Sequence, residues 1–396
     1  MTTQSGSNNK IGRRDAIIAG TGLAVTPFMG GFAAKQDKAG DPVPGTDGPF
    51  QTRAYGSKNS TGEMAEIEIK RREVGPHDVL LDVLYCGICH SDIHTVREEW
   101  GPAEHPTVPG HEVIGRVIAV GDQVTKFKVG DIGGVGCMVD SCRTCEMCED
   151  DREQICENGT TFTYGSKDKH GTASQTYGGY SDKIVVTEHF VIRIPPGMDL
   201  AATAPLLCAG ITTFSPMQHW DLKRNQRVAI AGLGGLGHMA VKLAVARGAE
   251  VTVVTTSPSK AEDAKRMGAK HVIVSTDREQ MQKGANYNDL LISTIPTAYP
   301  VQQYLNLLKP DGTLINVGAM EPLEGIHGMM LAFGRKSVAG SMIGGIAETQ
   351  EVIDYCAARG ITADIELVSP DQINESFEKV VNKEVRYRYV IDMKKA

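Results

Sequence analysis

The sequence predicts an α/β protein with two domains, one β-rich and barrel-like and one built on a doubly wound parallel sheet. Between residues 51 and 195, short β-rich segments are separated by Gly and Pro, which is typical of a compact β domain. After residue 195, apolar strands recur every 18 to 24 residues with helical stretches between them, as in parallel sheets. The length of 396 residues also exceeds what one hydrophobic core usually spans.

The elements follow in order along the chain. The first domain contains strands predicted at 79–85 and 113–120. The second contains six, at 227–231, 250–254, 271–274, 289–293, 313–317 and 337–341, and helices are predicted at 239–246 and 349–359. Strand material ending in 386–393 is expected to rejoin the first domain. We therefore expect an export signal and linker at 1–45, a β-rich domain at 46–199 with a cysteine lobe at 137–160, a dinucleotide-binding domain at 200–345 and a returning segment at 346–396.

The first 45 residues have the three regions of a secretory signal. A basic region ending in Arg13-Arg14 precedes an uncharged stretch at 16–34, and small residues follow at Gly31 and Ala33. The paired arginines resemble a twin-arginine signal, which predicts the export machinery as a partner and a periplasmic or exported location. The alternative is a disordered extension on a cytoplasmic protein. A stable membrane anchor is not expected, because the uncharged stretch is diluted by Gly and Thr.

Composition narrows the class of partner. With 41 Lys and Arg against 48 Asp and Glu, the net charge is −7, which argues against nucleic acid. The nine cysteines are clustered, and such clusters in a long chain indicate metal sites before disulfides.

A glycine-rich turn predicts dinucleotide binding. The residues from 232 to 238, GLGGLGH, follow a predicted strand and open a predicted helix, which is the context that a G-x-G-x-x-G motif requires. The first glycine permits the tight turn, the second lets the backbone approach the pyrophosphate, and the third allows close helix packing. The predicted contacts are Gly232, Gly234, Gly235, Leu236 and Gly237.

The end of the second strand of this sheet favours NADP(H). An NAD enzyme places Asp or Glu there to hold the ribose 2′-OH, but this chain has Thr255, Thr256, Ser257 and Lys260, with no acid before Glu262. Hydroxyl groups and a lysine suit a 2′-phosphate. The alternative is that Lys260 only faces solvent, which would leave the preference modest.

Four cysteines predict a structural metal site. Cys142, Cys145, Cys148 and Cys156 lie within fifteen residues, enough for a closed tetrahedral Zn²⁺ site. An iron–sulfur cluster is the alternative, but the ferredoxin run places its fourth Cys after three residues rather than seven.

A second, dispersed set of ligands predicts a catalytic zinc with an open position. It consists of the Cys86 and Cys89 pair, His111 in the segment PGHE, and Cys208 ahead of the dinucleotide domain. Two thiolates and an imidazole are ligands that catalytic zinc uses.

These residues resemble the zinc-dependent medium-chain alcohol dehydrogenases. The segments CGICHSDIH at 86–94, YGGY at 177–180, PLLCAGITT at 205–213 and SMIGG at 341–345 are most similar to the cinnamyl alcohol dehydrogenase branch, which includes bacterial NADPH-dependent aldehyde reductases. The resemblance runs from about residue 52 to the carboxyl end. It implies a GroES-like catalytic domain, a Rossmann cofactor domain and a homodimer or tetramer built on the last strand of the cofactor sheet.

The resemblance also implies roles for single residues. Cys89, His111 and Cys208 would hold the catalytic zinc, with Glu112 as a carboxylate that exchanges with water, and Ser91 and His94 would form a proton relay. Asp92 would support the ligands. Cofactor contacts would come from His90, Thr213, Ser341 and Ile343. Cys86, Cys137 and Cys356 remain without a role, and Trp100 is expected either to line the substrate pocket or to pack in the core.

Together these features predict an enzyme with two zinc ions per chain that reduces aldehydes to primary alcohols with NADPH. The zinc would polarise the carbonyl, and hydride would pass directly from the nicotinamide. Two alternatives remain: an NAD-linked alcohol oxidiser and a non-catalytic protein that binds NADPH and zinc.

Overall fold

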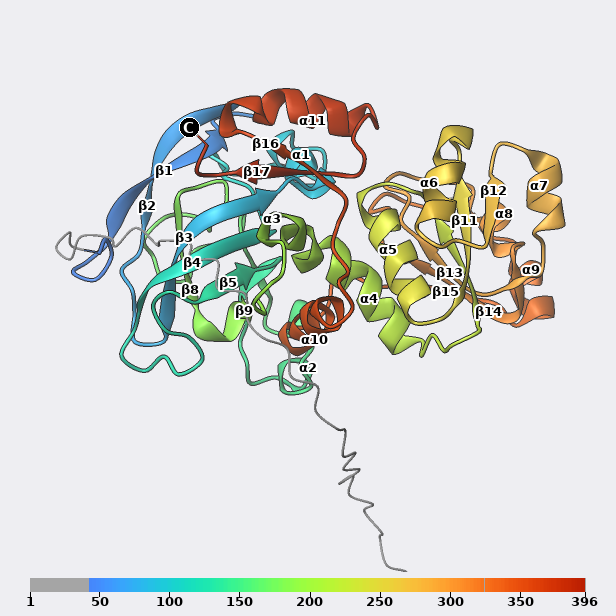
Figure 1. The fold of residues 1–396 in the computed structure, drawn as a ribbon, viewed down its shortest axis with the longest axis horizontal. Helices are drawn as coiled ribbons and strands as arrows, with labels where there is room; N and C mark the ends of the chain where they lie inside the picture. Colours follow the sequence, from blue (N-terminus) through green and yellow to red (C-terminus); the bar gives the residue numbers. More distant parts are fainter. Residues whose placement is uncertain (1–42, 324, 396) are drawn as a thin grey trace, which may run out of the picture. The chain divides into compact units, whose positions relative to one another are not determined.

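The structure is a computed structural model that describes residues 43–323 and 325–395. Nearly all of the predicted export signal therefore lies outside the described residues. These described residues belong to one compact unit. Among its described residues, a pair of large sheets positions the candidate sites (Figure 1).

The first sheet combines strands from both ends of the described chain. Its order is β16-β17-β3-β4-β5-β9, and β8 pairs with β3. β17 runs antiparallel to β3, with Ile391 opposite Cys86, so the carboxyl-terminal strands lie beside the strand that leads to the cysteine pair (Figure 1). The strands are β3 (Asp78–Gly87), β4 (Val113–Val120), β5 (Ile132–Val135), β8 (Lys183–Thr187), β9 (Val191–Arg193), β16 (Ile365–Val368) and β17 (Arg388–Asp392).

Two small antiparallel pairs flank this sheet. β1 (Phe50–Ser57) pairs with β2 (Met64–Arg71), and β6 (Met138–Asp140) pairs with β7 (Thr161–Phe162). The β6–β7 pair lies directly before and after the four lobe cysteines in the sequence.

The second sheet is parallel and has the order β12-β11-β10-β13-β14-β15. The order in which the chain adds strands reverses between β10 and β13, and this is the switch point at which such sheets bind ligands. The strands are β10 (Arg227–Ala231), β11 (Glu250–Thr255), β12 (His271–Val274), β13 (Asn288–Ser293), β14 (Leu308–Asn316) and β15 (Ser337–Gly340). All six predicted strands are present. β14 begins five residues earlier than predicted, because its first half contains Pro310 and Gly312 and therefore has no apolar strand pattern.

The helices are mostly short. They are α1 (His90–Val96), α2 (Glu146–Glu149), α3 (Leu200–Thr203), α4 (Ala209–His219), α5 (Gly235–Ala246), α6 (Ala261–Arg266), α7 (Arg278–Lys283), α8 (Val301–Leu305), α9 (Gly328–Gly334), α10 (Ile346–Ala357) and α11 (Ile373–Val381).

Two helices begin earlier than the sequence predicts. α5 starts within the glycine-rich turn itself, at Gly235. α10 starts at Ile346 instead of 349 because the buried carboxylate of Glu153 accepts a hydrogen bond from the Ile346 backbone N–H, at 3.0 Å. That cap comes from the cysteine lobe, far away in sequence.

The predicted fold class is confirmed: the structure combines a β-rich domain with a doubly wound parallel sheet. Within residues 43–323 and 325–395, no single helix is long and apolar enough to cross a membrane, and only the bent pair 200–207 and 209–219 reaches that length and composition together.

Candidate metal and dinucleotide sites

The four cysteines of the lobe converge on one point. One ligand atom from each of Cys142, Cys145, Cys148 and Cys156 lies within 4.8 Å of the others. The Sγ atoms of Cys142 and Cys148 are 3.9 Å apart, and those of Cys145 and Cys156 are 4.0 Å apart. Tetrahedral Zn–S bonds of about 2.3 Å place sulfurs about 3.8 Å apart, so the lobe fits a zinc ion.

Backbone groups already point at these sulfurs. The Cys145 N–H donates to the Cys142 Sγ at 3.3 Å, and the Cys142 N–H donates to the Cys156 Sγ at 3.4 Å. Such donors stabilise thiolates, which are the form that binds metal.

The dispersed ligands also meet. Cys89, His111, Glu112 and Cys208 are buried, and one ligand atom of each lies within 4.8 Å of the others. The Cys89 and Cys208 sulfurs are 4.0 Å apart, and the His111 Nε2 lies 3.2 Å from the Cys208 Sγ. The hydrogen bond from Cys208 lowers the pKa of Cys89 well below its ordinary value. Spacing alone did not decide whether Cys86 or Cys89 is the metal ligand. Cys89 belongs to this cluster, whereas Cys86 is buried in β3 and lies outside it.

Asp92 sets the orientation of His111. Its carboxylate lies 3.1 Å from the His111 Nδ1 and accepts hydrogen bonds from the Cys89 N–H at 2.9 Å and the Tyr180 hydroxyl at 3.1 Å. A carboxylate on Nδ1 leaves Nε2 free for a metal and fixes the ring.

Glu112 contributes a buried carboxylate to the cluster. Its Oε1 pairs with the Nη2 of Arg388, but its buried Oε2 has no hydrogen-bond partner among the described residues. Burial raises the pKa of Glu112 while Arg388 opposes that shift. An orphaned carboxylate oxygen beside two sulfurs and an imidazole fits a zinc ion with an exchangeable fourth position.

The predicted relay residues share helix α1. The Cys89 thiol donates to the Ser91 hydroxyl oxygen at 3.6 Å. The His94 ring stacks between His90 and Trp100, with ring centroids 4.8 Å away on each side, and its Nδ1 pairs with the Glu99 carboxylate. Trp100 is 48% exposed, so the core alternative for this residue is wrong.

The glycine-rich turn has the geometry that a pyrophosphate needs. Gly232 has φ of 92°, and a Cβ at Gly237 would lie 2.0 Å from the Gly232 carbonyl oxygen, so both positions need glycine. No atom of the described residues lies within 4 Å of the place where a Gly234 Cβ would be. The backbone there is open to a phosphate, directly before the amino terminus of α5.

The remaining predicted cofactor residues take several different positions. The Thr255 hydroxyl is buried and accepts from the Ser257 N–H at 3.2 Å, while Thr256 is exposed. Lys260 donates from Nζ to the Leu233 carbonyl at 2.9 Å, so it reaches across to the glycine-rich turn.

Three further predicted cofactor residues lie on α4 and in the loop after β15. The Thr213 hydroxyl donates within α4 to the Ala209 carbonyl at 2.8 Å. The Ser341 N–H donates to the Asn316 carbonyl at 3.1 Å, and Ile343 has a positive φ of 42°.

The sequence reasoning missed Arg388 and Glu99. Arg388 is buried, and a Cβ at Gly235 would lie 2.8 Å from its guanidinium, so it joins the metal cluster to the dinucleotide turn. Burial alone would lower the pKa of Arg388, but the Glu112 carboxylate raises it above its ordinary value. No local signal marks Arg388, because it is 276 residues from Glu112. Cys137, left without a role, lies beside Cys208.

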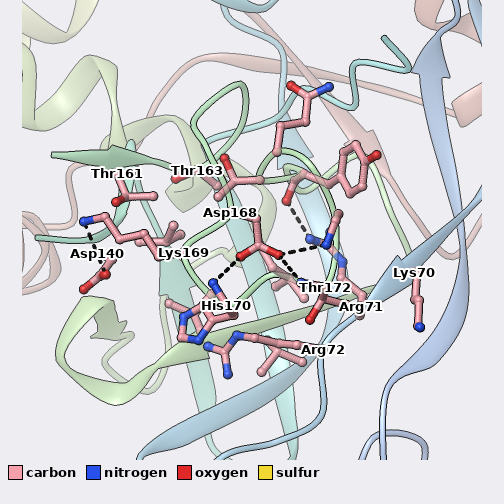
Figure 2. A pocket seen from close by; sticks show the side chains of 18 residues that line it. Lys70, Arg71, Arg72, Asp140, Thr161, Thr163, Asp168, Lys169, His170 and Thr172 are labelled. Carbon is pink, nitrogen blue, oxygen red and sulfur yellow. Dashed lines mark hydrogen bonds and ion pairs between the residues drawn. The ribbon is translucent and has the colours of Figure 1, made fainter. Parts of the chain in front are cut away.

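A separate cavity of about 70 Å³ lies between β2, the β6–β7 pair, β8 and the loop at 168–177 (Figure 2). Three of its charged groups have protein partners: Asp168 accepts from the backbone N–H groups of His170 and Thr172, and Lys169 pairs with Asp140 at 3.6 Å. None of the predicted metal ligands lines it.

Two family descriptions match the chain: "alcohol dehydrogenase GroES-like domain" over residues 75–196 and "zinc-binding dehydrogenase" over residues 235–358. NADP-dependent alcohol dehydrogenase C of Mycobacterium tuberculosis is 51% identical over 340 residues, which covers 86% of this chain and 98% of the relative. Aldehyde reductase YahK of Escherichia coli is 48% identical over 346 residues, 87% of this chain and 98% of the relative.

Two solved structures have a fold similar to that of this chain. Cinnamyl alcohol dehydrogenase from Sorghum bicolor has a TM-score of 0.84 at 42% identity, covering 87% of this chain and 98% of that one. The Helicobacter pylori enzyme called CAD, complexed with NADP(H), has a TM-score of 0.83 at 40% identity, covering 88% and 99%.

Proposed function

The chain belongs to the zinc-dependent alcohol dehydrogenase family, and from this premise we propose that its working direction is the reduction of aldehydes to primary alcohols. It is a zinc- and NADP-dependent oxidoreductase of alcohols and aldehydes. The convergence of Cys89, His111 and Cys208 beside the Glu112 Oε2, which has no hydrogen-bond partner among the described residues, supports the zinc chemistry. The similarity to an aldehyde reductase supports the reducing direction.

The residues of this chain have three roles: they bind the metal and cofactor, orient the metal ligands and transfer a proton. When bound, zinc supplies Lewis-acid polarisation of the carbonyl and NADPH supplies the hydride. Asp92 fixes His111, and Arg388 holds Glu112 while facing the pyrophosphate turn. Ser91 and His94, with the cofactor ribose between them, would deliver a proton to the product oxygen. Glu99 pairs with His94 and is 44% exposed, so it connects this relay to solvent.

An activity assay with matched cofactors tests the proposal. The zinc-loaded protein should oxidise NADPH with benzaldehyde-like and short aliphatic aldehydes. It should reach half of its maximal rate at a lower concentration of NADPH than of NADH. Turnover that requires NAD⁺ and alcohol would favour the alcohol oxidiser instead. Two bound zinc ions with no turnover would favour the non-catalytic binding protein.

We propose that the protein forms a homodimer through the outer strand β15. This strand is an edge of its sheet, and the adjacent helix α9 exposes Phe333 at 86%, Met329 at 63% and Met330 at 40%. An open edge beside exposed apolar side chains is a typical association surface. Phe333→Asp should halve the mass measured by sedimentation. Phe162→Asp, which changes an exposed phenylalanine on β7, should leave it unchanged, and a wild-type monomer would contradict the proposal.

We also propose that residues 1–45 direct export of the folded protein by the twin-arginine route. The support is the paired arginines before an uncharged stretch, and folded export would let the enzyme carry its NADPH with it. Fractionation of cells should find the wild type outside the cytoplasm and the variant with Arg13→Lys and Arg14→Lys inside it. An equal distribution of the two would contradict the proposal.

A further inference from the structure

The returning segment that ends in β17 lies along the dinucleotide turn. The Tyr387 ring stacks on His238, with centroids 5.2 Å apart and planes at 8°. Its hydroxyl donates to the Asp263 carboxylate at 2.8 Å. His238 follows the glycine-rich turn, and Asp263 is on α6, which follows β11. Tyr387 therefore fixes this segment against the edge where the adenosine end of a dinucleotide binds.

Two basic side chains, Lys260 and Arg386, lie close to Tyr387 and Asp263. The Lys260 Nζ lies 5.8 Å from the centre of the Tyr387 ring, and Arg386, next in the chain to Tyr387, pairs through Nη1 with Asp263. Burial and the nearby charges of Arg386 and Lys383 lower the pKa of Lys260. The end of β11 thus has more positive charge than the sequence motif alone predicted.

A 2′-phosphate needs that extra charge. A phosphate monoester carries about −1.5 to −2 charges at pH 7, which one lysine does not neutralise, and the Asp263 carboxylate nearby would repel it. Arg386 offsets Asp263 and remains 42% exposed, so some of its guanidinium N–H groups are free to bind an incoming ligand. Guanidinium groups bind phosphates through paired N–H donors.

We propose that Arg386 binds the 2′-phosphate of NADP(H) as the second cation beside Lys260, and that Asp263 and Tyr387 hold it in place. This assignment rests on the preference for NADP(H) in the proposed function. It makes the carboxyl-terminal segment a determinant of cofactor specificity, so that the choice of cofactor is not made by the Rossmann strands alone.

Binding of two nucleotide fragments to the zinc-loaded full chain tests the assignment without measuring turnover. By calorimetry, the wild type should bind 2′,5′-ADP more tightly than 5′-AMP, which differs from it only by the 2′-phosphate. Arg386→Gln should weaken 2′,5′-ADP binding by about 10-fold or more, the loss expected for a charge-assisted phosphate contact, and leave 5′-AMP binding within about 2-fold. Arg386→Lys should restore some of the difference.

Arg266→Gln is the matched control. Arg266 pairs with the same carboxylate, Asp263, at 2.9 Å, so this change removes the same charge and an ion pair with the same partner. It should leave the preference for 2′,5′-ADP unchanged. Equal losses in both variants, or equal weakening of both nucleotides by Arg386→Gln, would overturn the contact. No preference in the wild type would instead overturn the NADP(H) preference itself.

Discussion

Replacing Cys89 by Ser is expected to lower aldehyde reduction by about 10³-fold or more and to reduce bound zinc from two ions to one per chain. Cys89 is one of two sulfurs in the dispersed cluster, 4.0 Å from the other. Losing Lewis-acid catalysis removes several kcal/mol of transition-state stabilisation, and each 1.4 kcal/mol or so is a factor of ten. NADPH oxidation and metal analysis of the same sample measure both quantities.

Two comparison variants make this result specific. Cys86→Ala removes a buried thiol three positions away that lies outside the cluster, and it should keep two zinc ions and most of the activity. His94→Ala should also keep both ions but lose about 10²-fold in rate, because it removes only a proton-transfer group. Full activity in Cys89→Ser, or loss of zinc in Cys86→Ala, would contradict the assigned ligands.

The fold was largely predictable because its signals are local. Each strand of the parallel sheet is a short apolar run, and the glycine turn marks the first βα unit, so the pattern gives the order of the elements directly. The starts of α10 and β14 were not predictable in this way. The first depends on the Glu153 cap from the cysteine lobe, and the second pairs residues that include Pro310 and Gly312.

The candidate sites also differ in whether their signals are local in the sequence. The four-cysteine lobe could be predicted from spacing, because its ligands lie within one short loop. The dispersed ligands come from three separate segments, and spacing alone did not distinguish Cys89 from Cys86. Arg388 and Arg386 were missed because their importance comes only from tertiary contacts, with Glu112 and Gly235 for one and with Asp263 for the other.

Replacing Cys145 by Ser is expected to remove the lobe's zinc and to destabilise the protein while leaving the catalytic cluster assembled. Structural zinc contributes folding free energy directly, and a loss of about 3 kcal/mol or more would lower the unfolding midpoint by about 6 °C or more in a large domain. The lobe also supports α10, because Glu153 caps Ile346 and contacts His189 at 2.8 Å. Thermal unfolding and zinc content should therefore change together.

Cys356→Ala provides the control, because Cys356 is a buried thiol within α10 itself and belongs to neither cluster. Its loss leaves only a small cavity, so two zinc ions and nearly the full unfolding midpoint should remain. In Cys145→Ser, hydrogen exchange should rise first in the lobe and at the start of α10, since local stability follows the contacts that hold each segment. An unchanged midpoint with one zinc ion lost would show that the lobe folds without its metal and does not stabilise α10.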